Sequence, residues 1–289
     1  FAGTVTGTSF NGIPFFTDVP NQSMYTHDVS ATDLNAAQNS AYGFLSLDAI
    51  TTGDNNTAIG FQAGTQLTSA SQNTIIGALA GDALTEGGFN VAIGYAALSV
   101  EDTGSKNVAV GKSALNALNY NGDGYNVAVG YNAGLLVTTG IQNTIIGGLA
   151  GDSLMTGDNN VALGYAAFSA ANTNESGNVA IGSSALSALD NGTTAYTYNT
   201  AVGYAAGGAV TTGIKNTLIG GLAGDALTEG ENNVAIGYNA LTSETLGERS
   251  VAIGNKALQN QNNTSETNTY NVAIGYDAGT AMTTGVNNT

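Results

Sequence analysis

The stretch Asn90-Val91-Ala92-Ile93-Gly94-Tyr95-Ala96-Ala97-Leu98 is one copy of a unit that the chain repeats from residue 39 to its end, mostly at intervals of 17 residues. A fixed-period repeat predicts a solenoid, in which each coil buries its apolar side chains against the next coil. The other copies start at Asn56, Asn73, Asn107, Asn126, Asn143, Asn160, Asn178, Asn199, Asn216, Asn233, Ser250 and Asn271; a degenerate copy at Asn39 precedes them, and Asn288-Thr289 opens one more.

Each copy holds one short predicted strand. In residues 91–93 a β-branched, a small and a β-branched residue alternate, and Gly94 permits a tight turn. None of these strands carries a charge, so we expect a parallel sheet with both faces buried. The Asn before each strand is expected to form a ladder, each amide bonding to the next coil. The sequence therefore predicts an all-β fold, a parallel β-roll or β-solenoid of about 14 coils over residues 39–289.

The coils are of two types. Seven end in Ala-Gly and carry an apolar residue eleven places after the Asn, as Leu84 follows Asn73. The others end in Ala-Leu or Ala-Phe, with the apolar residue at eight places, as in Leu98. We therefore expect the second half of the coil to follow different paths in the two types. The two types recur as sets of four coils that begin at Asn56, Asn126, Asn199 and Asn271.

The last coil of each of the first three sets contains an insertion, at residues 116–125, 187–198 and 259–270. Insertions in solenoids commonly emerge on one face, which is often the binding face. The alternative is that they are merely tolerated at the surface. Each insertion ends in tyrosine, and two hold a further tyrosine. The candidate receptor-contact residues are therefore Tyr120, Tyr125, Tyr196, Tyr198 and Tyr270.

A second set of aromatic residues follows the strand glycine. A ladder of such rings could stack on sugars, and the alternative is that the rings pack against one another at the coil corner. The set comprises Phe61, Tyr95, Tyr131, Tyr165, Tyr204, Tyr238 and Tyr276.

Composition excludes several classes of partner. The net charge is −16 with only five Lys and Arg residues, which disfavours nucleic acid and anionic membranes. No run of about 20 apolar residues is present, so membrane insertion is not expected. The absence of cysteine removes disulfides and thiolate metal sites.

Residues 1–38 do not fit the repeat and are predicted to be a connector or the end of a preceding domain. The single histidine, His27, is expected to be a surface residue.

The acidic residues do not suggest a reaction. Asp82, Asp152 and Asp225 occupy the same place in successive sets, whereas a catalytic carboxylate pair should occur once. We therefore expect turn caps or solvated charges and no enzymatic activity. Neither the calcium-binding nonapeptide nor the EF-hand spacing is present. We expect no cofactor and only diffuse attraction of divalent cations. The alternative is an enzyme that cleaves polysaccharide on a solenoid.

The repeat also predicts an oligomer. A single chain with coils of 17 residues makes a thin roll whose charge-free strands would leave a long apolar stripe in water. Three chains around a common axis would bury that stripe, so we expect a homotrimer. With strands about 4.8 Å apart, such a stack would be a rod of roughly 65 Å.

Two forms of the repeat resemble known families. Asn-x-Val-Ala-Ile-Gly-x-x-Ala resembles the head repeat of trimeric autotransporter adhesins, a left-handed parallel β-roll of three chains. The longer unit Thr-Thr-Gly-x-x-Asn-Thr-x-Ile-Gly-x-x-Ala-Gly, at residues 138–151 and 211–224, resembles repeats of phage tail-fibre proteins. The resemblance covers residues 39–289. It implies a left-handed homotrimeric roll in a phage tail fibre or virion appendage.

The expected function is a structural and adhesive fibre segment, a rigid trimeric rod for host-cell attachment. Its expected partners are further copies of the chain, a cell-surface glycan or other host receptor, and neighbouring fibre or virion proteins. The expected location is the virion, or the cell surface and extracellular space. The alternative is a bacterial trimeric surface adhesin head or extracellular filament with the same roll.

Overall fold

The structure is a computed structural model that describes residues 9–10, 13–14, 16–18, 23–25, 35–170, 175–192 and 196–289. Every regular element in these residues is a β-strand, and none of them is helical. The chain divides into two compact units, residues 1–139 and 140–289. His27 lies outside the described residues.

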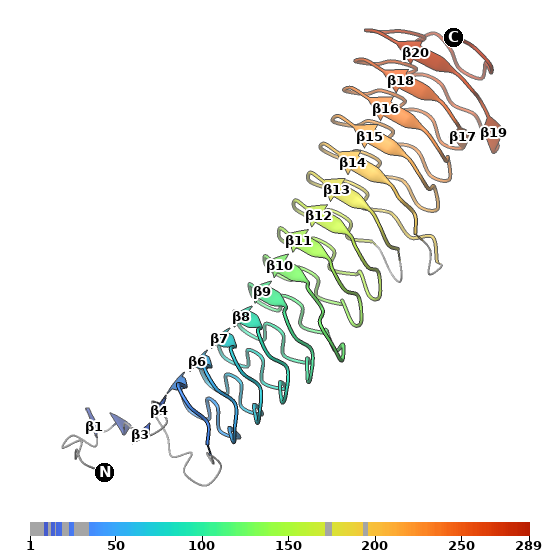
Figure 1. Ribbon diagram of the computed structural model, residues 1–289. Coiled ribbons are helices and arrows are strands. Elements are labelled where there is room, and N and C mark those ends of the chain that lie inside the picture. Colours follow the sequence, from blue (N-terminus) through green and yellow to red (C-terminus); the bar gives the residue numbers. More distant parts are fainter. Residues whose placement is uncertain are drawn as a thin grey trace. The chain divides into compact units, whose positions relative to one another are not determined.

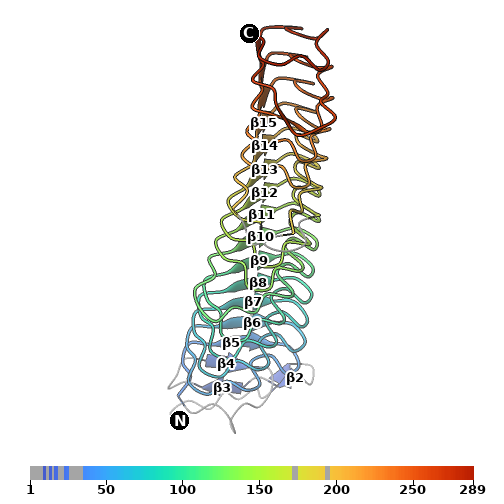
Figure 2. The ribbon, with the colours of Figure 1, turned by 90° about the vertical axis from the view of Figure 1, so that its right-hand side faces the viewer.

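The first unit is built on one parallel sheet, whose strands pair in chain order from β5 to β10 (Figures 1 and 2). The pairing is in register, so that Thr57 lies opposite Thr74 and then Thr74 opposite Val91. The strands are β5 (Ser40–Tyr42), β6 (Thr57–Ile59), β7 (Thr74–Ile76), β8 (Val91–Ile93), β9 (Val108–Val110) and β10 (Val127–Val129).

Part of the segment before residue 39 joins this sheet. Strands β3 (Phe16–Asp18) and β4 (Ser23–Tyr25) form an antiparallel pair, and β4 pairs in parallel with β5. The Met24 N–H donates to the Asn39 carbonyl at 2.8 Å. A separate antiparallel pair is formed by β1 (Ser9–Phe10) and β2 (Ile13–Pro14).

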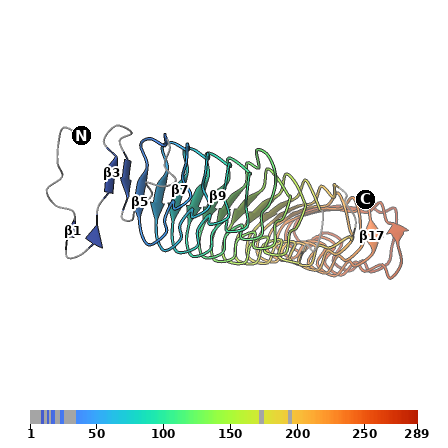
Figure 3. The same ribbon diagram turned by 90° about the horizontal axis from the view of Figure 1, so that it is seen from below.

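The second unit repeats the same design. Its strands again follow one another in chain order, each joined to the next by a return loop (Figure 1). Figure 3 shows the stacked return loops from below. A small parallel pair of β17 (Gly247–Glu248) and β19 (Thr267–Asn268) forms beside it. The main strands are β11 (Thr144–Ile146), β12 (Val161–Leu163), β13 (Val179–Ile181), β14 (Thr200–Val202), β15 (Thr217–Ile219), β16 (Val234–Ile236), β18 (Val251–Ile253) and β20 (Val272–Ile274). The two units together make the predicted parallel β-solenoid of about fourteen coils.

From β5 onward, only one face of each strand in the main sheet is buried. In β8 the central Ala92 is fully buried, whereas Val91 and Ile93 are half-buried. The expectation of two buried faces is wrong for the single chain. The reason is that alternate side chains point to opposite faces, and one coil encloses only one of them. From β6 onward the outer face therefore presents two rows of aliphatic and Thr side chains in each unit.

The two coil types follow the same backbone path as far as the eighth residue, and most Leu-type coils share it beyond, so the expected difference is wrong for most coils. The eighth residue after the Asn is left-handed in both, with φ of 49° at Gly81 and 54° at Leu98. In both types, except in the described coil of Leu98, the N–H of the eleventh residue donates to the carbonyl of the eighth. The distance is 3.2 Å from Leu84 to Gly81 and 3.2 Å from Leu118 to Leu115.

Side-chain volume, rather than path, separates the types. A Cβ placed on Gly81 would lie 3.0 Å from Leu84 Cδ1 and 3.4 Å from Ile75 Cδ1, so neighbouring side chains already fill this part of the interior. In the following coil the strand centre is Ala92, and Leu98 supplies the buried volume instead. Each coil thus reaches a filled core with a different distribution of side chains.

The predicted asparagine ladder is confirmed within each unit. The Asn73 N–H and side-chain Nδ2 both donate to Asn56 Oδ1, at 3.0 and 3.1 Å, and Nδ2 also donates to the Gly87 carbonyl. Each ladder side chain thereby satisfies buried backbone groups that no strand reaches. Ser250 interrupts the ladder. Gln261 bridges the gap, donating to Ser250 Oγ and accepting from Asn271 Nδ2, both at 2.8 Å.

Candidate functional site

The last tyrosine of each insertion occupies the same place in its coil. Tyr125, Tyr198 and Tyr270 each directly precede a ladder Asn, with φ of 51°, 52° and 49°. Their side chains are about half exposed, at 50%, 54% and 52%. The left-handed backbone before the buried Asn turns these rings outward at one edge of the sheet.

The first cluster joins a tyrosine to an ion pair. Lys106 Nζ lies 2.6 Å from Asp123 Oδ2 and 3.1 Å from the Tyr125 hydroxyl, and it sits 5.1 Å from the Tyr125 ring centroid. The hydrogen bond from Lys106 lowers the pKa of Asp123, and the same bond raises the pKa of Lys106. These groups are exposed, so water competes for the pair. Tyr120, from the same insertion, is half-buried.

The second and third clusters vary this arrangement. Tyr196 and Tyr198 stack with ring centroids 5.4 Å apart and an angle of 20°. Residues 193–195 of that insertion lie outside the described residues. At the third insertion, the Arg249 guanidinium lies 6.0 Å from the Tyr270 ring centroid and donates to Glu248 Oε2 at 2.8 Å. The first and third clusters thus share a tyrosine, a cation and a carboxylate.

Three buried glutamates anchor the insertions. Glu101, Glu175 and Glu244 are fully buried. Each accepts an N–H from the insertion of the following coil. The donors are Tyr120 N to Glu101 at 3.2 Å, Asn191 N to Glu175 at 2.9 Å and Asn263 N to Glu244 at 2.9 Å. Each long loop is therefore fastened to the coil before it by a charge-assisted hydrogen bond.

The sequence carried a signal for two of these anchors. Glu101 and Glu244 stand eleven places after their Asn, where Leu84 and its equivalents form the core. Burial raises the pKa of Glu101, opposed by the N–H groups of Gly104, Tyr120 and Asp102. Glu244 also accepts from Gln261 Nε2 at 2.8 Å and from Asn263 Nδ2 at 2.9 Å.

The aromatic residues after the strand glycine form an exposed column in each unit. In the first unit Phe44 and Phe61 stack with centroids 6.2 Å apart, and Lys112 lies 5.3 Å from the Tyr131 ring centroid. The exposed fractions range from 49% at Phe61 to 75% at Tyr276. Packing at the coil corner, the alternative interpretation, therefore covers only part of each ring.

The acidic residues at the repeated place behave in two ways. Asp225 Oδ1 accepts a hydrogen bond from the Thr242 hydroxyl. The Oδ1 atoms of Asp82 and Asp152 are buried and have no hydrogen-bond partner among the described residues. Desolvation raises the pKa of both carboxyls. These residues are neither simple caps nor fully solvated charges.

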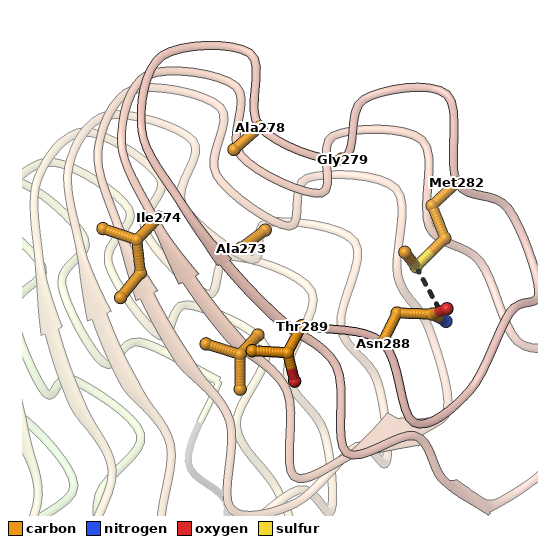
Figure 4. A pocket seen from close by; sticks show the side chains of 8 residues that line it. Ala273, Ile274, Ala278, Gly279, Met282, Asn288 and Thr289 are labelled. Carbon is orange, nitrogen blue, oxygen red and sulfur yellow. Dashed lines mark hydrogen bonds between the residues drawn. The ribbon is translucent and has the colours of Figure 1, made fainter.

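A hollow of about 290 Å³ opens on the last coil (Figure 4). Its lining holds no titratable side chain, and its central Ala273 is the equivalent of the buried Ala252 one coil earlier. The hollow is thus the surface on which one coil stacks upon another. It is lined by Val272, Ala273, Ile274, Ala278, Gly279, Met282, Asn288 and Thr289.

Among the residues that the structure describes, no group of three or more His, Cys, Asp or Glu side chains could hold a metal ion. The same residues contain no helix long and apolar enough to cross a membrane. Comparison with known proteins found no matching family, no matching curated protein and no matching solved structure.

Proposed function

We propose that this chain is a structural and adhesive fibre segment that acts as a stiff homotrimer in attachment to a host cell, in a phage tail fibre or virion appendage. The observation that carries the proposal is the outer face of the sheet. From β6 onward every strand of the main sheet carries two outward aliphatic or Thr side chains there, and residues such as Leu163 and Ile219 are 40% and 38% exposed. An apolar face that persists through all these coils favours burial against further copies of the chain.

Stiffness is supported by the hydrogen bonds between coils. Strand pairing and the buried ladder bond each coil to the next within a unit. In a stack of this kind a coil cannot tilt without breaking several buried bonds. Exposed tyrosines at three insertions supply repeated weak contacts, and repetition over three chains would raise the overall affinity for a surface.

The oligomeric state in solution tests whether the chain forms the proposed homotrimer. Sedimentation equilibrium should give three times the chain mass of 28.8 kDa. The double variant Leu163→Lys/Ile219→Lys places charges on the outer face and should yield a folded monomer. The control Asn255→Lys adds a charge at the sheet edge and should remain trimeric. A monodisperse wild-type monomer would rule out the trimer.

Attachment is tested separately. Labelled protein should adhere to some members of a panel of bacterial strains, and trimming the three insertions to the 17-residue coil length should reduce adhesion. Unchanged adhesion would show that the insertions are not the contact. The bacterial adhesin head is the second candidate, and residues flanking this stretch in the gene would separate the two. Release of sugars from a polysaccharide panel would favour the enzyme instead.

A further inference from the structure

In the second unit the aromatic column has a regular period. The residue after the strand glycine is tyrosine in every second coil, and a small or polar residue lies between. Backbone bonds keep this column in register, for example Ser184 N to Tyr165 O at 3.0 Å and Leu222 N to Tyr204 O at 2.9 Å. The tyrosines are therefore two coils, or about 9.6 Å, apart. The tyrosine ladder consists of Tyr165, Tyr204, Tyr238 and Tyr276, and the residues between are Gly148, Ser183, Gly221 and Asn255.

The rings of this ladder are open to a ligand. Their exposed fractions are 61%, 65%, 52% and 75% in chain order. Two of them reach back over the glycine of the coil before: a Cβ on Gly148 would lie 3.8 Å from Tyr165 Cδ2, and a Cβ on Gly221 would lie 3.5 Å from Tyr238 Cδ2. None of the four hydroxyls bonds to a described residue, in contrast to the Tyr125 hydroxyl, which is held by Lys106 and Asp123.

Packing does not impose the two-coil spacing. Phe44 and Phe61 occupy this column in consecutive coils, where their rings stack at an angle of 9°. Ser183 and Asn255 show that the column also accepts polar residues without a ring. The fold tolerates rings in adjacent coils, and it also tolerates coils without a ring. Coil packing therefore does not require the alternation of tyrosines, which is a feature of the exposed surface.

We propose that the tyrosine ladder binds an extended, uncharged polysaccharide that runs along the stack. Successive tyrosine rings stack on alternate sugars of the polymer. This inference rests on the proposed attachment function and names its ligand class. In an extended β-1,4-linked chain alternate pyranose rings turn the same face to one side, and two sugars have nearly the length of two coils. The apolar carbon face of a pyranose fits an aromatic ring, and the free hydroxyls can bond to sugar hydroxyls.

The neighbouring side chains favour a ligand without charge. The ladder is bordered on the strand side by Leu163, Val202, Ile236 and Ile274. On the other side it is bordered by Ala166, Ala205, Asn239 and Asp277, so the one charged side chain at these positions is acidic. The chain carries a net charge of −16, so an anionic polymer would be repelled.

Each ring contributes little binding energy alone, and repetition of the rings raises the overall affinity. The stacking of nucleic-acid bases on aromatic side chains is a comparable contact. By that comparison, removing one ring should lower the affinity about tenfold. The affinity should also rise with the length of the oligosaccharide, in steps of about two sugars.

The test uses the full chain and affinity electrophoresis in gels containing hydroxyethylcellulose, with β-1,4-linked N-acetylglucosamine oligomers as soluble competitors. Tyr204→Ser and Tyr238→Ser should each weaken binding about tenfold, and the double variant about a hundredfold. The matched control is the exchange Tyr204→Gly/Gly221→Tyr, which keeps composition and charge but breaks the spacing. It should bind as weakly as Tyr204→Ser. Phe89→Ser, at an exposed ring outside both the ladder and the insertions, should bind as the wild type does.

Several results would overturn the inference. These are no retention of the wild type, an exchange variant that binds as well as the wild type, or equal retention by curved α-1,4-linked amylose. A change of sedimentation mass in the ladder variants would instead assign the rings to a seam between chains. Adhesion to the bacterial panel is measured in parallel. If the wild type adheres and the ladder variants adhere equally well, only the role of the ladder is overturned. If the wild type does not adhere at all, the proposed function itself is overturned.

Discussion

The buried asparagine ladder makes the sharpest prediction for stability, and Asn216 is the place to test it. Its Nδ2 donates to the Gly230 carbonyl at 2.8 Å and to Asn199 Oδ1 at 3.2 Å, and its Oδ1 accepts the Asn233 N–H at 2.9 Å. In Asn216→Ala two buried backbone groups lose these bonds, the Gly230 carbonyl and the Asn233 N–H. The Asn199 side chain keeps the bond from the Asn216 N–H.

The expected cost follows from those two groups. An unsatisfied buried donor or acceptor costs roughly 1–3 kcal/mol, so the substitution should cost about 4 kcal/mol. For a unit of this size each kcal/mol lowers the melting temperature by about 2–4 °C, giving a fall of about 8–16 °C. Because a solenoid can open locally, the amides of the coils at Asn216 and Asn233 should also exchange hydrogen faster than those of distant coils.

Urea unfolding followed by circular dichroism, with hydrogen exchange by mass spectrometry, measures both effects. The matched control is Asn255→Ala, the same change at a half-buried side chain with no hydrogen bond to a described residue. If Asn216→Ala costs less than about 1 kcal/mol, or no more than the control, the ladder does not stabilise the stack as argued.

Three further predictions follow from particular sites. Glu101→Leu restores the apolar residue of equivalent coils but removes the acceptor of the Tyr120 N–H, so hydrogen exchange at Tyr120 should rise. It also leaves the buried Gly104 N–H without its acceptor, so the free energy of unfolding should fall by about 1–3 kcal/mol; a slow Tyr120 amide would contradict the anchor. Burial raises the pKa of Asp152, so the ionised carboxylate destabilises the folded state. This loss of stability is present at pH values above the raised pKa, and it disappears as the pH falls through that pKa. Asp152→Asn should therefore stabilise the protein at neutral pH and lose that advantage in acid, measured by thermal melts across pH, whereas Asp225→Asn, which weakens the bond from the Thr242 hydroxyl, should not stabilise. Gly77→Ala should abolish the stacking of its coil, since the new Cβ would meet the Gly94 carbonyl oxygen at 2.4 Å; soluble protein with a native circular dichroism spectrum would refute this.

Much of the architecture could be predicted from the residues of one coil. The alternation in residues 91–93 predicts a strand, and the repeat places that strand beside its equivalents in parallel. The Asn before it has a short amide that reaches its own equivalent in the adjacent coil, and the ladder is present. These features are local or follow from translation along one axis, so one copy suffices to predict them.

The insertions illustrate what was only partly predictable. The sequence located the loops and their tyrosines, and the structure places Tyr125, Tyr198 and Tyr270 in equivalent, half-exposed positions. The sequence did not predict that Glu101 and Glu244 fasten these loops. A glutamate in a core position is recognised as an anchor only when the N–H groups that surround it in space are known.

The sequence by itself thus determined the strand, the coil period, the ladder and the parallel order, because each depends on residues at fixed separations along the chain. Tertiary structure alone decided that the glycine coils and most leucine coils share one path, since interior volume is shared between neighbouring coils, as Gly81 and Ile75 show. It also decided which side of each strand is buried, and that the ladder tyrosines stand open at two-coil spacing. Exposure depends on what the rest of the fold leaves uncovered, and no single repeat contains that information.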